Sequence, residues 1–297
     1  MIGGVYPVKK LSILLLTLML CLFSTVSPAE TEGDFVYSIH DGQAIITAYT
    51  GNASELVIPD TLGGCPVTSI RYCAFRECVT LTRITLAHGI TSIGSNAFQG
   101  CSSLRHIDLP DSLAAIGTHA FYGCPELTLI TIPDSIQRIH PYAFYGCSAT
   151  RQCSLNGPAA LVLTDFGYSF TCPEYPLLAL KAYEDDSGLR AFTVADCHES
   201  AVNVTFPAGV TAIDRYAFFE CASLAEITIP EGVREIPHAA FDGCASLAQV
   251  TLPGSVAKIE DSAFARCPNI TILSPAGSAA QAFAEAHAEN GFIWLPL

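Results

Sequence analysis

An Ala-Phe pair followed three residues later by a cysteine occurs seven times in this chain. The copies form two groups, and within each group successive copies are 23 residues apart. A fixed period of this length indicates a structural repeat in which each unit packs against its neighbours. The first group contains Phe75, Phe98, Phe121 and Phe144 with Cys78, Cys101, Cys124 and Cys147, and the second contains Phe218, Phe241 and Phe264 with Cys221, Cys244 and Cys267.

The unit "LTRITLAHGITSIGSNAFQGC", from Leu81 to Cys101, shows how one repeat is built. Residues around Ile84 alternate between apolar and polar, which is typical of a short strand. Other units have a proline just after this strand, where a residue without a backbone N–H ends the pairing: Pro110, Pro133, Pro230 and Pro253. We predict a solenoid with one parallel sheet along one side and with units about 4.8 Å apart. The phenylalanines would then form an interior stack, and the cysteines a second buried column.

Units of the form L-x-x-I-x-I-P followed by I-x-x-I-G-x-x-A-F-x-x-C resemble the BspA-type leucine-rich repeats of bacterial and protist surface proteins. The resemblance extends over nearly all of the chain after residue 30 and implies a leucine-rich-repeat fold. It also implies a secreted or surface-attached protein, because members of this family are often exported and some bind host matrix proteins or other microbes. The family has no fixed binding motif, so the resemblance assigns no binding residue.

The two groups of repeats are related by an offset of 120 residues, which aligns Phe98 with Phe218 in the sequence. The segments "SLNGPAA" from Ser154 and "SPAGSAA" from Ser274 share this offset. The second segment is rich in alanine and ends at Asn290-Gly291, which predicts a helix with a C-terminal stop. A helix there would cover the last unit, and the matching segment after Cys147 predicts a helical cap on the first array as well.

We therefore expect two short modules, residues 30–176 with a cap and residues 177–297 with a C-terminal cap helix. Both open on similar segments, "YSIHDG" from Tyr37 and "YEDDSG" from Tyr183. The first resembles the entry hairpin common in the family, and the second departs from it. The alternative is one continuous solenoid with a protruding insertion near residues 148–182.

Residues 1–29 have the pattern of a secretory signal peptide. Lys9 and Lys10 precede an uncharged apolar run from Leu11 to Val26, and Ala29 stands at a position that signal peptidase prefers. An uncleaved membrane anchor is the alternative, but the run is shorter than the roughly 20 residues needed to span a bilayer. Lipidation at Cys21 is a further alternative, although the bulky Leu20 before it is unfavourable.

The net charge and the lack of known catalytic or metal-binding motifs argue against several classes of function. A net charge of −14 argues against binding to nucleic acids or to an anionic membrane. We expect no cofactor, no metal site and no enzymatic activity, because no C-x-x-C, nucleotide-binding or hydrolase motif is present. The segment "DCHES" from Asp196 to Ser200 gathers catalytic residue types, but such a mixture is ordinary for a loop. Among the cysteines outside the repeat position, Cys153 and Cys172 are the best candidates for a disulfide.

The exposed side of the repeat strands is the expected binding face, because solenoids bind through such surfaces. We predict two columns of side chains on it. The Thr85 column is Thr85, Asp108, Thr131, Thr205, Thr228 and Thr251. The Arg83 column, two residues earlier in each strand, is Arg83, His106, Leu129, Asn203, Glu226 and Gln249. Tyr122, Tyr145 and Phe219, which follow the Ala-Phe pair, are a second candidate surface, since aromatic residues are enriched at interfaces.

From these features we expect a secreted or cell-surface protein that binds an extracellular protein or a glycan, with a role in adhesion or in contact between host and microbe. The alternative is an extracellular or envelope-associated structural protein without a dedicated ligand. Threonine columns are consistent with both hypotheses, since β-branched residues suit a pleated surface in either case.

The signal-peptide pattern generates the first prediction. Protein exported by a bacterial cell should begin at Glu30, because cleavage is expected after Ala29. N-terminal sequencing of the exported protein measures this directly. A mature chain that still begins at Met1 would contradict it.

Overall fold

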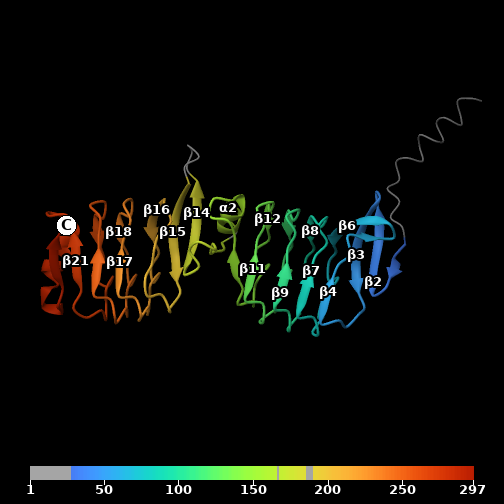
Figure 1. Ribbon diagram of the computed structural model, residues 1–297, viewed down its shortest axis with the longest axis horizontal. Helices are drawn as coiled ribbons and strands as arrows, with labels where there is room; N and C mark the ends of the chain where they lie inside the picture. The colour runs from blue at the N-terminus through green and yellow to red at the C-terminus, as the bar shows by residue number, and fades with distance from the viewer. Residues whose placement is uncertain (1–27, 166, 185–189) are drawn as a thin grey trace, which may run out of the picture.

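The computed structural model describes residues 28–165, 167–184 and 190–297, and the predicted signal peptide lies almost entirely outside them. The chain forms an elongated solenoid whose turns are stacked along the long axis, from the N-terminal to the C-terminal array (Figure 1). The predicted repeat solenoid is thus confirmed. Buried side chains form a single hydrophobic core that runs through the stack.

Each repeat contributes two short strands, which lie in two separate rows along the solenoid; each row, or ladder, is divided into shorter hydrogen-bonded sheets. The strands of the first ladder are β4 (Glu55–Val57), β7 (Arg83–Thr85), β9 (His106–Asp108), β11 (Leu129–Thr131), β13 (Thr150–Gln152), β17 (Glu226–Thr228), β19 (Gln249–Thr251), β21 (Thr271–Ser274) and β22 (Ile293–Pro296). Those of the second are β6 (Cys65–Ile70), β8 (Ser92–Ile93), β10 (Ala115–Ile116), β12 (Arg138–Ile139), β16 (Val210–Ile213), β18 (Glu235–Ile236) and β20 (Lys258–Ile259).

The second ladder was not predicted, because we expected a sheet along one side only. Its strands in the repeats are mostly two residues long, which is too short for a visible alternation of apolar and polar residues. They nevertheless pair in register, with Ile93 beside Ile116 and Ile116 beside Ile139. These isoleucines are buried, so the core lies between two ladders rather than behind one sheet.

Both arrays begin with an antiparallel hairpin. In the first, β1 (Glu30–Glu32) pairs with β2 (Phe35–His40), β2 pairs with β3 (Gln43–Tyr49), and β3 then runs parallel to β6, which also pairs with the short β5 (Thr61–Leu62). In the second, β14 (Leu178–Glu184) pairs with β15 (Arg190–Cys197), which runs parallel to β16. The second opening segment thus has the same pairing pattern as the first, although its sequence departs from it.

The described residues contain two α-helices, and each follows an array of repeats. Helix α2 (Pro158–Asp165) comes after β13 and also packs against β14 of the second hairpin. Thr164 Oγ1 accepts a hydrogen bond from the Ala182 backbone N–H at 2.9 Å, and Arg190 Nη1 donates to the Gly157 carbonyl at 2.9 Å. The helix therefore has neighbours from both arrays, and the division into modules 30–176 and 177–297 stays a prediction.

Helix α3 (Ala279–Ala286) follows the second array and begins at Ser278, whose hydroxyl accepts from the Gln281 N–H. A short 3₁₀ turn, η1 (Ala288–Asn290), leads to Gly291, which has the left-handed conformation (φ 86°) that stops a helix. The α-helix itself ends at Ala286, four residues before the predicted stop at Asn290-Gly291, and Gly291 ends the 3₁₀ turn instead. The chain does not end with the helix, however, because β22 follows and pairs with β21 as the last strand of the first ladder.

The phenylalanines of the repeat form two interior stacks. Ring centroids of Phe98 and Phe121 are 5.4 Å apart with the planes 1° from parallel, and the Phe121–Phe144 pair is alike at 5.4 Å and 2°. Phe218 and Phe241 are separated by 4.8 Å in the second array. All of these rings are buried. The predicted phenylalanine stack is therefore confirmed, and the small alanine before each ring leaves room for the neighbouring backbone.

A backbone ladder runs through the same turn. The N–H of Phe98 donates to the Ala120 carbonyl of the next repeat at 2.8 Å, and the N–H of Phe121 donates to that of Ala143 at the same distance. In two repeats a glycine follows the second-ladder strand, and a Cβ at Gly117 would lie 2.6 Å from the Ser95 nitrogen of the previous repeat, so a side chain there would require the backbone to shift.

The repeat cysteines complete this turn. The thiol of Cys124 donates to the Phe98 carbonyl of the previous repeat at 3.2 Å, and Cys101 does the same to Phe75 at 3.1 Å. Cys147, Cys244 and Cys267 make the equivalent bond. A cysteine fits here because it is small and apolar yet still has a weak S–H donor.

Five of the seven repeat cysteines are buried, and Cys78 and Cys147, at the two ends of the first column, are half-buried. All of the cysteines in the described residues are free thiols, so the suggested Cys153–Cys172 disulfide is not present. Both of these thiols are buried, and burial is the main cause that raises the pKa of Cys153 to about 12. Packing in the core therefore accounts for them without a bond.

The stack generates a prediction on stability. Phe121→Ala should lower the free energy of unfolding by about 3–5 kcal/mol, because it leaves a cavity between the rings of Phe98 and Phe144. Tyr122→Ala, at a side chain that is 38% exposed, should cost roughly 0.5–1 kcal/mol. Urea unfolding of both variants measures the difference. Equal losses would show that the inward and outward assignments are wrong.

The cysteine column generates a prediction on reactivity. Contact with the Cys101 thiol, together with burial, raises the pKa of Cys124 to about 12, so at pH 8 it is a neutral thiol that reacts poorly with maleimide. We expect Cys101, Cys124, Cys221 and Cys244 to be labelled only after unfolding, because all four thiols are buried in the folded chain and the reagent cannot reach them. The half-buried Cys65 is the internal control and should be labelled first. Mass spectrometry of timed samples checks this order, and early labelling of Cys124 would contradict it.

Candidate functional site

The twelve residues of the predicted binding face lie on or beside the first ladder and reach solvent. Ten are exposed, while Thr85 and Thr251 are half-buried. Strand pairing aligns them in the predicted columns, with Arg83 beside His106 and Glu226 beside Gln249. Asn203 joins the Arg83 column through an isolated β-bridge to Glu226. The columns therefore exist as surface features, although their role in binding stays a prediction.

On the first array, charged and polar side chains of the binding face contact one another. Thr85 Oγ1 donates to Asp108 Oδ2 at 3.1 Å, and Arg83 Nη1 lies 3.7 Å from the same oxygen. Leu129, at 47% exposed, adds an isolated apolar side chain. Because Arg83 and Asp108 are exposed, their ion pair contributes little to stability, but these contacts occupy groups that could otherwise bind a ligand.

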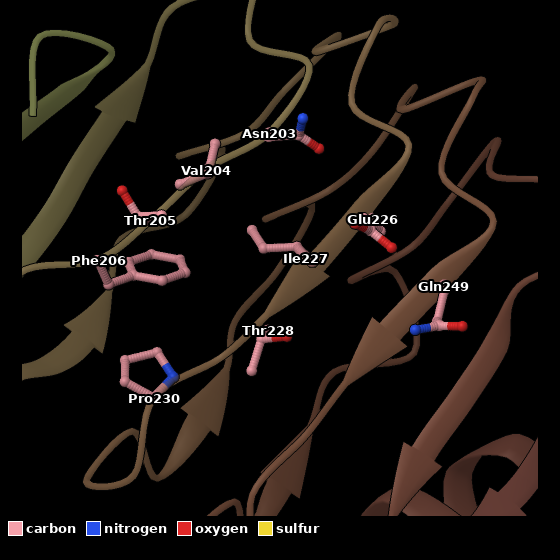
Figure 2. A pocket seen from close by; sticks show the side chains of 9 residues that line it. All are labelled: Asn203, Val204, Thr205, Phe206, Glu226, Ile227, Thr228, Pro230 and Gln249. Carbon is pink, nitrogen blue, oxygen red and sulfur yellow. The ribbon is translucent and has the colours of Figure 1, made fainter.

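On the second array, the same face is hollowed. A cavity of about 480 Å³, the strand-face hollow, brings together five of the predicted residues: Asn203, Thr205, Glu226, Thr228 and Gln249. Val204, Phe206, Ile227 and Pro230 supply its apolar part. Figure 2 shows Phe206 and Pro230 on one side and Glu226 and Gln249, on neighbouring strands, on the other. Seven of the predicted residues lie outside this hollow, and six of them are on the first array.

The strand-face hollow lies where the first ladder is interrupted. Residues 203–206 pair with β17 through Asn203 alone, so they do not form a full strand beside it. Phe206 occupies the position of Leu86 and Ile229 in other repeats, but it is half-buried, and its ring meets that of Phe218 edge-on at 6.1 Å. Sequence reasoning missed Phe206, although an aromatic residue at a position otherwise held by Leu or Ile was an available signal.

The polar groups of the strand-face hollow are available for a ligand. Within the described ranges, the side chains of Asn203, Glu226 and Gln249 make no hydrogen bond to the protein, and Glu226 has no ion-pair partner. Two amides, two hydroxyls and a carboxylate beside apolar side chains can form several hydrogen bonds while burying apolar surface. This combination is typical of binding sites, where a few polar groups give specificity.

The "DCHES" segment overlaps the end of β15 and is tied into the fold: the His198 backbone N–H donates to the Leu177 carbonyl at 2.8 Å, and the Cys221 thiol contacts the Cys197 and His198 carbonyls. His198 Nδ1 lies 2.8 Å from Ser200 Oγ and accepts from the Ser200 backbone N–H at 3.2 Å. Contact with the Cys221 thiol, and then burial, raises the pKa of Cys197, which is the opposite of what a cysteine nucleophile needs. Across the part of the chain that the structure describes, no group of three or more His, Cys, Asp or Glu side chains is arranged to hold a metal ion.

A family model for the BspA type leucine rich repeat region matches six copies in this chain, over residues 67–166 and 190–286. These segments make up more than half of the sequence. The chain belongs to the BspA-type leucine-rich repeat family. The matched segments contain both phenylalanine stacks, so the sequence match and the structure agree on the family. In residues 28–165, 167–184 and 190–297, no helix is both long and apolar enough to cross a membrane.

Several solved leucine-rich repeat proteins are similar to this chain. The T. pallidum leucine-rich repeat protein is 24% identical, with 90% of this chain and 98% of that chain covered and a TM-score of 0.36. A leucine-rich repeat protein from Bacteroides capillosus is 29% identical over 43% of this chain and 99% of its own, with a TM-score of 0.40. A leucine-rich cell surface protein from Faecalibacterium prausnitzii is 23% identical, with 92% and 96% covered and a TM-score of 0.34.

These TM-scores are low, and the family assignment therefore depends on the repeat model alone. Among curated proteins, none matches the chain significantly.

Proposed function

We propose that the protein is exported and, either secreted or held at the cell surface, binds another macromolecule through the exposed face of the first ladder. The strand-face hollow supports this proposal most directly. It combines Asn203, Glu226 and Gln249, whose side chains have no partner in the described protein, with the apolar surface of Phe206 and Pro230. Exposed groups left unpaired on a rigid ladder can bind a ligand without first breaking contacts of their own.

Membership of a family of repeat proteins is a second support. Stacked repeats give a long, rigid surface whose exposed residues vary from unit to unit, which suits recognition of a protein or a glycan better than chemistry on a small substrate. Adhesion, or contact between a microbe and its host, is the function that we favour for such a surface outside the cell.

Binding of residues 30–297 to immobilised host matrix proteins, host cells and bacterial cells tests this proposal. Glu226→Arg reverses the charge in the strand-face hollow and fills part of it, so it should weaken binding at least about tenfold. Glu289→Arg makes the same charge change at an exposed residue of η1, outside the hollow, and should bind like the native protein. Both variants should keep the native melting temperature.

Two outcomes would contradict the proposal. If Glu226→Arg and Glu289→Arg bind equally well, the ligand does not contact the strand-face hollow. If the native protein binds none of these surfaces, the alternative of an extracellular structural protein without a dedicated ligand is favoured.

A further inference from the structure

A second cavity lies between the last Ala-Phe turn of the first array and the segment that follows α2. This tyrosine hollow has a volume of about 460 Å³ and shares no residue with the strand-face hollow. Its walls include Pro141, Tyr142, Tyr145, Arg151 and Tyr168. Tyr142 and Tyr145 are 59% and 61% exposed, which is unusual for two large aromatic side chains that lie side by side.

The tyrosines end two short columns of aromatic rings. Tyr145 is stacked on Tyr122 of the previous repeat at 5.7 Å, and Tyr142 on His119 at 5.8 Å. The regular repeat stops after Cys147, and within the described residues no ring from the following turn contacts either tyrosine. The two rings are themselves 6.2 Å apart with their planes at 75°, so together they form an aromatic corner that is open to solvent.

Arg151 is held at this corner in a fixed orientation. Its Nε donates to the Ser169 carbonyl at 3.2 Å, and its Nη1 donates to the Ala149 carbonyl at 2.9 Å. The guanidinium carbon lies 5.1 Å from the centroid of the Tyr168 ring, within the range of a cation–π contact. The side chain is therefore pre-organised, and Nη2 remains as the donor group without a protein partner in the described chain.

The charge of Arg151 is not balanced by the protein. Of the ion pairs found among the described residues, none involves this guanidinium, although the chain as a whole has a net charge of −14. Burial lowers the pKa of Arg151, but a guanidinium stays protonated at neutral pH. A half-buried cation without a counter-ion is costly, and an anionic ligand would relieve that cost.

We propose that the tyrosine hollow binds a carboxylate-bearing sugar residue, a sialic or uronic acid, within a glycan. The tyrosine rings contact the apolar C–H face of the pyranose, and Arg151 binds its carboxylate through the free Nη2. A guanidinium held in a fixed plane matches a carboxylate better than an ammonium group does. The corner of two rings and the volume suit a compact ring-shaped ligand rather than an extended peptide.

Titration of residues 30–297 with sialyllactose and with an oligosaccharide that ends in glucuronic acid tests this inference. Lactose is the matched neutral probe, because it lacks the carboxylate. We expect saturation-transfer NMR to show contact of at least one acidic probe with tyrosine rings, with an affinity at least about tenfold above that for lactose, as for one charge-assisted hydrogen bond. A short peptide with a free C-terminal carboxylate is the third probe and should not compete.

Two substitutions locate the site. Tyr145→Ala removes an exposed ring, and Arg151→Lys keeps the charge but loses the planar donor group; each should weaken binding of the acidic probe about tenfold or more. Tyr72→Ala is the matched control, since Tyr72 is also 61% exposed but does not line the tyrosine hollow, and this variant should bind like the native protein. Circular dichroism checks folding, and Tyr145→Ala decides the result if Arg151→Lys does not fold.

Several results would overturn the inference: no binding of either acidic probe at about 10 mM, equal binding of lactose, native affinity in Tyr145→Ala, or displacement by the peptide. The test is independent of the proposed function, because Glu226→Arg should leave binding of the acidic sugar unchanged. A protein that binds the sugar but no macromolecule through the strand-face hollow would keep this inference and lose the other.

Discussion

The structure depends on one set of contacts between successive repeats, in the turn that contains the Ala-Phe pair. The phenylalanine N–H donates to the alanine carbonyl of the next repeat, and the phenylalanine carbonyl accepts the thiol of that repeat's cysteine, as in Phe98 with Ala120 and Cys124. The ring itself packs on its equivalents. Backbone, side chain and thiol therefore require the same spacing, which explains why the three residue types recur together and why neither group of repeats departs from a period of 23 residues.

Both candidate sites lie where this regular stacking is interrupted. The first phenylalanine stack ends at Phe144, which meets Tyr168 at 78°, and the second begins at Phe218, which meets Phe206 at 71°. An edge-on ring closes a stack but does not reproduce the flat surface of a further repeat, so side chains beside it stay uncovered. The tyrosine hollow is next to Tyr168, and the strand-face hollow is next to Phe206.

Most of the regular structure could be predicted from the sequence, because identical repeat positions must superpose in a solenoid. The inward positions of Phe121 and Cys124 follow from the period alone. The second ladder could not be predicted in this way, since a pair such as Ala115-Ile116 is too short to show a strand pattern. Nor could β22, whose pairing with β21 depends on where α3 directs the chain.

The candidate sites were predicted less well for a related reason. Periodicity identifies which columns are exposed, and Asn203, Glu226 and Gln249 were found through it. Periodicity gives no information about positions where the period fails. Phe206 and Arg151 lie at the ends of the arrays, where some of their neighbours belong to no repeat position. Contacts such as Arg151 with Ser169 and Ala149 join segments that share no repeat position, so they became visible only in the folded chain.

The direction of the backbone hydrogen bonds has a mechanical consequence. In each ladder they join one turn to the next, so they are aligned with the long axis of the solenoid (Figure 1). Tension applied between the two ends would load the turns in series, and only the few bonds of one interface would resist at a time. Under flow or traction, such a chain should peel open turn by turn and lengthen at modest force, rather than resist as a rigid rod until it breaks all at once.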